Sequence, residues 1–346
     1  MIIGIPKEVK PAERRIALTP TACAQVLAAG HQVVMEQGAG QGAGFEDQDY
    51  ASLGVKILLD AAELYGKAEL VVKVKEPQPE ELPLLRRDHI LFCYLHLGGN
   101  PKLTESLLQI GLTGYAFETV GVDRKTPLLA PMSALAGRLS VQLGARFLHS
   151  SQGGRGTLLG GTLDHSSGKV VVLGAGVAGT EAAVLARQMG AEVWLIDLAA
   201  EAMARAHQAA AGLHCEVSQP GLLERLLPKA DLLVGAVYLP GKRAPIVVTE
   251  QQMALMPEGS VAVDIAIDQG GCFATSRPCT HKEPFYRELG VLHSAITNLP
   301  AAVPRTASTA LSEAVLPYLI QMADGKVDAG LARGLNLRAG RLELEL

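Results

Sequence analysis

The sequence predicts an α/β protein of two doubly wound domains, the second a Rossmann-type cofactor domain with a mainly parallel sheet. Short apolar runs alternate with helical segments along the chain, as in parallel sheets with helical crossovers. The length of 346 residues corresponds to about two domains, and a hydrophobic content of 48% supplies apolar material for two cores. A glycine-rich turn follows one apolar run in the second half.

The first half alternates strand and helix signals. Thr19 is a candidate N-cap, Pro20 is suited to the first helical position, and this helix is expected to end at Gly30. The glycine-rich segment 38–44 is expected to be a loop. Further helices are predicted at Ala61–Lys67 and Pro101–Ile110. The predicted strands are Ile2–Ile5, His31–Glu36, Val55–Leu59, Glu69–Lys75, Ile90–Leu95 and Thr113–Phe117.

The second half repeats this alternation after a helix predicted over Ser133–Leu148 and a loop over Ser150–Gly161. No strand follows the last predicted helix, Thr306–Ala323, so we expect it to pack back on the first domain. The expected division is therefore 1–130 plus 303–346 for a substrate/catalytic domain and 131–302 for the cofactor domain. The predicted strands are Lys169–Leu173, Glu192–Ile196, His214–Val217, Asp231–Ala236, Ser260–Ile267 and Val291–Thr297.

Composition argues against several classes of partner. The net charge of −4 and the single tryptophan offer neither a basic surface nor stacking platforms for nucleic acid. The five cysteines are widely spaced without a CxxC pair, and the nine histidines do not pair at ligand spacing, so we expect neither a disulfide framework nor a metal site. No signal-type segment or apolar run of membrane-spanning length occurs. We expect a cytoplasmic protein.

Residues 169–197 form the strongest motif. The apolar run 170–173 is followed by Gly174-Ala175-Gly176-Val177-Ala178-Gly179, then by a helix predicted over Thr180–Met189 and a strand that ends at Asp197. The first glycine permits a tight turn, the second lets the backbone approach a pyrophosphate, and the third allows close packing of helix on strand. The helix N-terminus attracts the pyrophosphate. The alternative interpretation is a glycine-rich turn without a ligand.

Asp197 bears on the choice of cofactor. A carboxylate at the end of the second strand accepts hydrogen bonds from the adenosine ribose and repels a 2′-phosphate, which favours NAD over NADP. The alternative is a solvated strand-end carboxylate.

Further polar residues stand at the ends of predicted strands, where doubly wound sheets bind ligands. They are Asp268, Asn298, His96 and Lys75, with Arg15 in the loop before the first helix. Together they could hold a small oxo-acid beside a nicotinamide. Each has a plainer interpretation: a solvated lysine, a structural histidine, or a solvated pair formed by Arg15 with Arg14. Asp264, inside the strand predicted at 260–267, is expected to have a hydrogen-bonded structural role.

The chain also resembles the alanine dehydrogenase family, which shares its fold with the soluble part of transhydrogenase. The matching stretches run in the same order from residue 1 to about 325. They are IPKEVKPAERRIALTP at 5–20, VVKVKEPQPEELPLL at 71–85, LFCYLHL at 91–97, LLAPMSALAGRLS at 128–140, VVVLGAGVAG at 170–179, VDIAIDQGGCFATSRPCTH at 263–281 and NLPAAVPRT at 298–306.

The resemblance implies NAD-dependent oxidative deamination of L-alanine to pyruvate and ammonium, and the reverse amination, by a homo-oligomer that is hexameric in the family. It assigns substrate binding to Arg15, Lys75 and Asn298, and acid–base catalysis to His96 and Asp268, which are expected to face one another across a cleft. The expected cofactor contacts are Ser133, Gly174, Gly176, Val177, Ala178, Gly179, Asp197, Leu239, Ile267, Arg277 and Leu299.

Two other functions remain open at this point. One is a related NAD-linked enzyme that acts on a different amino or imino acid, which substrate profiling would separate. The other is a non-catalytic NAD(H)-binding component like that of transhydrogenase. The second alternative treats the grouping of Arg15, Lys75, His96 and Asp268 as accidental.

Overall fold

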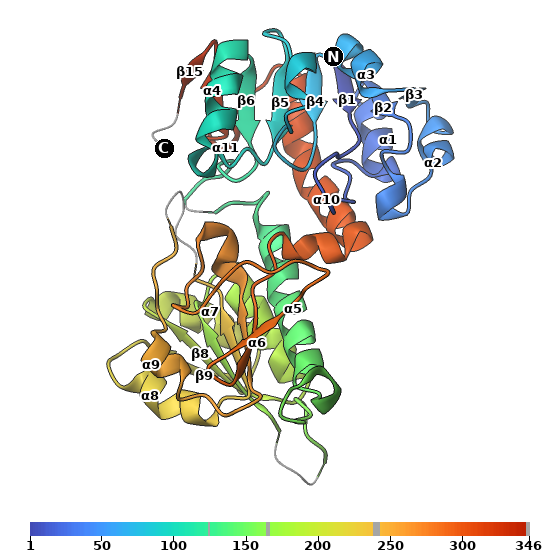
Figure 1. Cartoon of the computed structure of the whole chain (residues 1–346). Coiled ribbons are helices and arrows are strands. Elements are labelled where there is room, and N and C mark those ends of the chain that lie inside the picture. The colour runs from blue at the N-terminus through green and yellow to red at the C-terminus, as the bar shows by residue number, and fades with distance from the viewer. Residues whose placement is uncertain (124, 164–166, 238–242, 344–346) are drawn as a thin grey trace. The chain divides into compact units, whose positions relative to one another are not determined.

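The computed structural model describes residues 1–123, 125–163, 167–237 and 243–343. The chain forms two compact units, each with its own sheet (Figure 1). Unit 1 comprises Met1–Met132 and Val303–Leu346, and unit 2 comprises Ser133–Ala302. Both sheets are mainly parallel, which confirms the predicted α/β class. No helix in the described part of the chain is long and apolar enough to cross a membrane.

The sheet of unit 1 has the strand order β15-β14-β6-β5-β4-β1-β2-β3. Strands β1 to β6 are parallel and follow the order 3-2-1-4-5-6 of a doubly wound fold, whereas β14 and β15 pair antiparallel at one edge. The strands are β1 Ile2–Ile5, β2 Gln32–Glu36, β3 Lys56–Leu58, β4 Leu70–Val72, β5 Ile90–Cys93, β6 Thr113–Ala116, β14 Leu335–Arg338 and β15 Arg341–Leu342.

Helices cover the sheet of unit 1, and residues that alternate along β4 and β5 are buried on both of its faces. One face packs on α3 and α4 through a cluster that includes Leu64, Leu91 and Leu107. Helix α10 packs against α1, where the Ser308 and Ser312 hydroxyls accept the backbone N–H groups of Ile16 and Thr19 at 2.9 and 3.0 Å. The helices are α1 Pro20–Ala28, α2 Asp47–Ala51, α3 Ala61–Lys67, α4 Pro101–Ile110, α10 Pro304–Ala323 and α11 Ala329–Ala332.

The sheet of unit 2 has the order β12-β13-β11-β10-β7-β8-β9. Apart from the antiparallel edge strand β12, this is again the order 3-2-1-4-5-6, with the topological switch between β7 and β10. The strands are β7 Lys169–Leu173, β8 Glu192–Asp197, β9 His214–Val217, β10 Leu232–Gly235, β11 Val261–Asp264, β12 Tyr286–Glu288 and β13 Val291–Ser294. The helices are α5 Ala130–Phe147, whose first residues belong to unit 1, α6 Val177–Gln188, α7 Ala200–Ala209, α8 Leu222–Leu226 and α9 Glu250–Met253.

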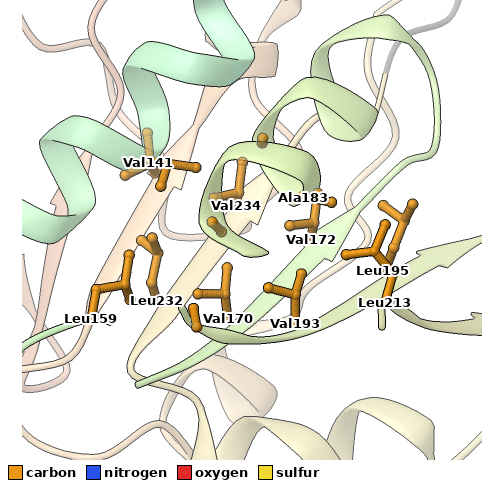
Figure 2. Packing of buried hydrophobic residues seen from close by; sticks show 14 of the residues in the cluster. Val141, Leu159, Val170, Val172, Ala183, Val193, Leu195, Leu213, Leu232 and Val234 are labelled. Atoms are coloured by element: carbon orange, nitrogen blue, oxygen red, sulfur yellow. The ribbon is translucent and has the colours of Figure 1, made fainter. Parts of the chain in front are cut away.

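The core of unit 2 lies on both faces of its sheet. Val170 and Val172 of β7 pack with Val141 of α5 and Ala183 of α6 (Figure 2), and their cluster extends to α7. The alternate residues Val171 and Leu173 belong to a second cluster that contains Leu226 and Met253. A strand buried on both faces must be apolar at nearly every position. This requirement explains the continuous apolar runs that revealed these strands in the sequence.

Local predictions fail where side chains override the apolar pattern. The strand predicted over 260–267 ends at Asp264, because the Asp264 carboxylate accepts the N–H of Ala266 and starts the 3₁₀ helix η6, Ile265–Gln269. Thr19 occupies the N-cap of α1 but forms no side-chain cap hydrogen bond; its hydroxyl lies 3.3 Å from that of Ser312. The short antiparallel strands β12, β14 and β15 were not predicted.

All five cysteines are free thiols.

Candidate functional site

The carboxyl ends of the central strands in unit 2 lie along one edge of the sheet. Strands β8, β7, β10, β11 and β13 are successive parallel neighbours. Gly174 follows β7, Asp197 ends β8, Asp268 lies just beyond β11, and Asn298 lies beyond β13. Doubly wound sheets bind ligands at this edge, outside the switch point.

The glycine turn has the geometry that its spacing predicts. Gly174 has φ +99°, which disfavours other residues, and a Cβ on Gly179 would lie 1.7 Å from the carbonyl oxygen of Gly174. Nothing lies within 4 Å of a Cβ built on Gly176, so a ligand can approach the backbone there. Helix α6 begins at Val177, three residues earlier than predicted, and no side chain caps it. The first N–H groups of α6 therefore suit an anion.

Asp197 holds the same turn from the neighbouring strand. Its carboxylate accepts the backbone N–H of Ala175 at 2.5 Å and that of Ala199 at 2.8 Å. An ionised carboxylate has about four acceptor positions, so these two bonds still allow it to accept from ribose hydroxyls. Asp197 is partly buried and hydrogen-bonded to the backbone, so it is more than a freely solvated strand-end carboxylate.

Asp268 lies inside the 3₁₀ helix η6 rather than directly at the end of a strand. Its exposed carboxylate lies 3.4 Å from the backbone nitrogen of Asn298, which donates to it. The buried carboxylate of Asp264 holds the whole segment, because it accepts the N–H groups of Ala266 and Cys272 at 2.9 and 2.8 Å as well as the Ser276 hydroxyl. The structural role expected for Asp264 is confirmed.

Arg277 is held by an aromatic residue. Its guanidinium lies 3.9 Å from the centre of the Tyr286 ring, and its backbone N–H donates to the Tyr286 hydroxyl at 2.8 Å. The Tyr286 ring is also stacked on that of His293, with ring centres 5.2 Å apart. This arrangement fixes the direction of a side chain that would otherwise be free to rotate in solvent.

The remaining predicted cofactor residues are distributed over three elements. Ser133 is half-buried near the start of α5, Ile267 is buried in η6, and Leu299 is the buried first residue of the 3₁₀ helix η7, Leu299–Ala302. Leu239 lies outside the described residues. No cluster of metal-binding side chains occurs among the residues that the structure describes.

In unit 1 the predicted residues also lie at the carboxyl ends of neighbouring parallel strands. Strands β6, β5, β4 and β1 are successive parallel neighbours. His96 follows β5, Lys75 follows β4, and Arg15 lies in the loop between β1 and α1. The strand-end rule therefore brings these three residues to one edge.

Arg15 is buried, with 2% of its surface exposed, whereas Arg14 is exposed. The interpretation of the two arginines as a solvated pair is therefore wrong for Arg15. The Nε and Nη2 atoms of Arg15 donate to the two carboxylate oxygens of Glu13 at 2.7 and 2.5 Å, and its Nη1 lies 3.1 Å from the Met132 sulfur. A bidentate pair of this kind fixes the plane of the guanidinium.

Lys75 is also buried, which rules out a simple solvated lysine. The Glu8 carboxylate holds its segment by accepting the N–H groups of Val74 and Lys75 at 2.5 and 3.4 Å. A second buried lysine, Lys73, lies 2.9 Å from Glu81 and 3.4 Å from Glu8. Burial raises the pKa of Glu8, and the ammonium of Lys73 opposes that rise. Burial acts to lower the pKa of Lys73, but Glu8 and Glu81 outweigh this effect and raise it.

His96 has a half-exposed ring that is stacked almost parallel on Tyr94, with ring centres 5.8 Å apart. Tyr94 is buried and donates to the Leu128 carbonyl at 2.6 Å. Burial raises the pKa of Tyr94, and the nearby cation of Arg15 opposes that rise. The carboxylate of Glu118 accepts the backbone N–H of His96 at 2.6 Å. Arg15, Tyr94, His96 and Glu118 thus form one local group.

Sequence reasoning missed the acidic partners Glu8, Glu13 and Glu118. Glu118 follows β6 as His96 follows β5, so the strand-end rule that selected His96 could have found it. Glu8 and Glu13 lie in a loop between β1 and α1, and nothing in their spacing announces their burial.

Two surface cavities of about 320 and 250 Å³ lie at the opposite, amino end of the strands of unit 2. Their linings include Glu192, at the start of β8, and none of the predicted site residues. Ligands of doubly wound sheets bind at the carboxyl ends of the strands, so these cavities lie away from the expected site.

Two family models match the chain: "Alanine dehydrogenase/PNT, N-terminal domain" over residues 4–136 and "Alanine dehydrogenase/PNT, C-terminal domain" over residues 140–344. An alanine dehydrogenase of Bacillus subtilis is 45% identical over 98% of this chain and 90% of the relative. One of Methanococcus maripaludis is 43% identical over 100% of this chain and 95% of the relative.

Solved structures agree with these matches. A structure titled L-alanine dehydrogenase superimposes with a TM-score of 0.95 and 46% identity, covering 99% of this chain and 97% of the other. A transhydrogenase structure from Sinorhizobium meliloti has a TM-score of 0.86 at 24% identity, over 99% of both chains, and shows the shared fold.

Proposed function

The chain belongs to the alanine dehydrogenase/PNT family, and from this premise we propose that it is an NAD-dependent L-alanine dehydrogenase. The reaction is the oxidative deamination of L-alanine to pyruvate and ammonium, together with the reverse reductive amination. The observation that carries the proposal is the 45% identity to an alanine dehydrogenase over almost the whole chain, which includes both domains of the family.

Unit 2 is the proposed NAD-binding domain. The turn at Gly174 and the uncapped N-terminus of α6 would hold the pyrophosphate, and Asp197 would accept from the adenosine ribose. Arg277, held by Tyr286, would approach the cofactor as the resemblance implies. The open space at Gly176 and the geometry of Asp197 fit this group. When bound, NAD accepts the hydride from the substrate.

Unit 1 is the proposed substrate domain. Arg15 pairs with the substrate carboxylate, and Lys75 contacts the carboxylate or carbonyl oxygen. The fixed plane of Arg15 supports this assignment, because the guanidinium is oriented before the substrate arrives and loses little freedom on binding. Asn298 is the proposed third substrate residue.

His96 and Asp268 handle the protons. After oxidation of the Cα, water adds to the iminium carbon, and a general base must take the proton of that water. Either residue can do this, and histidine has the better intrinsic pKa for the task. His96 then transfers a proton as the carbinolamine collapses to pyruvate and ammonium. The half-exposed ring of His96 supports a role in contact with substrate.

The direct test of this function is oxidation of NADH by the purified protein with pyruvate, with and without ammonium. Ammonium-dependent oxidation that yields alanine is expected. Oxidation without ammonium would indicate a hydroxy-acid dehydrogenase instead, and no oxidation with either mixture would remove the proposed activity. Profiling other oxo-acids in the same assay would reveal a preference for a substrate other than pyruvate.

We also propose a cytoplasmic homo-oligomer, hexameric as in the family. Light scattering coupled to size-exclusion chromatography measures the assembly directly. A monomer of 36.4 kDa at micromolar concentration would contradict it.

A further inference from the structure

The segment between Cys272 and Cys279 leads from the carboxyl end of β11 to that of β13. At its start, the N–H of Cys272 donates to the carboxylate of Asp264, the last residue of β11, at 2.8 Å. At its end, the N–H of Cys279 donates to the carbonyl of Ala295, just beyond β13, at 2.7 Å. Arg277 lies between these two anchors and is exposed. Its side chain is therefore at the carboxyl edge of the sheet in unit 2.

Tyr286 holds both the backbone and the side chain of Arg277. It begins β12 and pairs antiparallel with His293, so it too lies near the carboxyl end of β13. The guanidinium lies 3.9 Å from the centre of the Tyr286 ring. The Tyr286 hydroxyl accepts the Arg277 N–H at 2.8 Å and donates to the Thr275 carbonyl at 2.7 Å. Because Pro278 follows, the backbone of Arg277 is also restricted to extended conformations.

The strand order sets which half of a dinucleotide would reach Arg277. Asp197 ends β8 and the glycine turn follows β7, and these two strands serve the adenosine and the pyrophosphate in the proposed function. A dinucleotide crosses the switch point of a doubly wound sheet, so its nicotinamide half falls to β10, β11 and β13. Arg277 belongs to this side of the sheet, as do Asp268 and Asn298.

A cation on that side distinguishes the two redox forms of the cofactor. The nicotinamide ring of NAD⁺ carries a positive charge and that of NADH does not, whereas the rest of the molecule is the same. A nearby guanidinium therefore disfavours NAD⁺ relative to NADH. The carboxylates of Glu288, 3.9 Å from the Arg277 guanidinium, and of Asp268 have the opposite effect. Loss of Arg277 would leave these carboxylates uncompensated and shift the preference towards NAD⁺.

We propose that Arg277 makes the cofactor site bind NADH more tightly than NAD⁺, and that Tyr286 is the positioning residue that holds the guanidinium in place for this task. The inference rests on the proposed function, since it assumes that unit 2 binds NAD(H) along the carboxyl edge of its sheet. Neither residue takes part in hydride or proton transfer.

The test compares the affinities of the full-length protein for the two redox forms in the absence of substrate. Fluorescence titration gives the Kd for NADH, and competition against NADH gives the Kd for NAD⁺. We expect Arg277→Ala to lower the ratio of the Kd for NAD⁺ to the Kd for NADH by about 5- to 10-fold, the effect of one partly screened charge a few ångströms from the ring.

Two substitutions of Tyr286 separate the ring from the hydroxyl. Tyr286→Leu removes both contacts and should lower the same ratio by about 2- to 5-fold, because the guanidinium is then free to turn into solvent. Tyr286→Phe keeps the ring and should give a ratio between those of Tyr286→Leu and the wild type. In an Arg277→Ala background, Tyr286→Leu should change the ratio no further, since its effect passes through the missing guanidinium.

The matched control is Phe45→Leu in unit 1, where the Arg305 guanidinium lies 5.0 Å from the centre of the Phe45 ring. This variant loses the same kind of contact and should keep the wild-type Kd values for both redox forms. A purely structural role for Tyr286 would give a lower melting temperature and an unchanged ratio. Partial unfolding does not mimic the expected result, because it raises both apparent Kd values by the same factor.

Three results would overturn the proposal: a wild type that binds NAD⁺ at least as tightly as NADH, an unchanged ratio in Arg277→Ala, or an unchanged ratio in Tyr286→Leu. A further change in the double variant would likewise remove Tyr286 as the residue that acts through Arg277. Failure of the proposed function looks different. A wild type that binds neither redox form removes the cofactor site together with this inference, whereas one that binds both but lacks ammonium-dependent activity removes only the proposed reaction.

Discussion

Buried or partly buried carboxylates hold the segments that bear the proposed site residues. Glu13 pairs with the Arg15 guanidinium, Glu8 accepts N–H groups beside Lys75, and Glu118 accepts those of the His96 turn. In unit 2, Asp197 and Asp264 do the same for the glycine turn and for η6. Backbone N–H groups left open where strands end need acceptors. A carboxylate satisfies several of them at once and fixes the direction of the neighbouring side chain.

Arg15 and Lys75 should anchor the substrate carboxylate. Loss of a buried, charge-assisted contact costs about 2–5 kcal/mol, so Arg15→Ala and Lys75→Ala should each lower kcat/KM for pyruvate by about 30-fold or more. The Kd for NADH should change little, since both residues lie in unit 1. Steady-state kinetics and NADH fluorescence titration measure the two effects. Near-normal kcat/KM in both variants would show that the substrate carboxylate does not bind to Arg15 and Lys75.

Stability must be separated from binding in these variants. Arg15→Ala removes the bidentate guanidinium partner of the fully buried Glu13 carboxylate, which should cost about 3–5 kcal/mol of unfolding free energy. Arg15→Ala combined with Glu13→Ala should recover much of that loss without recovering activity. Lys73→Met is the matched control for Lys75, because Lys73 is also buried and pairs with Glu8 and Glu81. It should lower the melting temperature while folded molecules keep their turnover.

Asp197 should determine the preference for NAD. Its carboxylate would lie against the 2′-phosphate of NADP, and a like-charge contact costs several kcal/mol, so we expect NAD to be preferred by about 100-fold or more. Asp197→Ser or Asp197→Ala should relax or reverse that preference. Because Asp197 also accepts the Ala175 N–H, NAD affinity should fall as well. Equal kcat/KM of the wild type with NAD and NADP would remove this role.

Only some of these residues could be recognised as functional from the sequence alone. Gly174, Gly176 and Gly179 could be predicted because a turn, a helix start and their spacing are local properties. The strand-end rule could also have selected Glu118, but the burial of Arg15, Glu8 and Glu13 could not be predicted, since it depends on which strands become neighbours. That order is a property of the tertiary fold.

At the scale of elements, the central strands were predictable because burial on both faces demands continuous apolar runs. The short antiparallel strands β12, β14 and β15, which lie at or next to a sheet edge, have no continuous apolar run and escaped prediction. The end of β11 was misplaced because Ile265, Ala266 and Ile267 are apolar enough for a strand. The Asp264 carboxylate turns them into the 3₁₀ helix η6, and this effect depends on distant donors such as Cys272.

The β12–β13 hairpin should make stability depend on pH. Burial lowers the pKa of His293, on β13, to about 4, below its value of about 6.5 in an unfolded chain. Between these values the unfolded state binds more protons, so the stabilising contribution is complete above about pH 6.5 and is lost as the pH falls towards 4. His293→Phe, which preserves the stack on Tyr286, should reduce the fall in unfolding free energy between pH 7 and pH 5. Urea unfolding at both pH values measures this; an unchanged difference would contradict the assignment.

At the scale of the whole molecule, the two units have the same strand order, and in both of them the proposed functional residues lie at the carboxyl ends of the strands. In both sheets the order 3-2-1-4-5-6 gathers the proposed functional residues at carboxyl ends. The chemistry at the two edges differs. Unit 2 offers a helix N-terminus and an acidic residue for a dinucleotide, and unit 1 offers buried cations for an oxo-acid. The proposed reaction needs the residues of both units. Substitutions in the site of one unit should therefore abolish turnover, while the ligand of the other unit still binds.

His96 in unit 1 and Asp268 in unit 2 provide the test of this division. Positioned acid–base groups contribute about 10²–10⁴-fold in rate, so His96→Ala and Asp268→Asn should each lose activity by that order or more. NADH affinity should stay nearly intact, because neither residue is assigned to binding the dinucleotide. Deamination should be favoured at alkaline pH, since the amine of alanine must lose its proton before hydride leaves.

A structural role for the same two residues predicts a different outcome. A histidine that only packs on Tyr94, or an aspartate that only accepts the Asn298 N–H, would be needed for stability rather than for proton transfer. Its loss would lower the melting temperature and leave near-normal turnover in the molecules that remain folded. Thermal unfolding and turnover measured on the same preparations separate the two accounts. Folded variants with near-normal kcat in both directions would remove His96 and Asp268 as the acid–base pair.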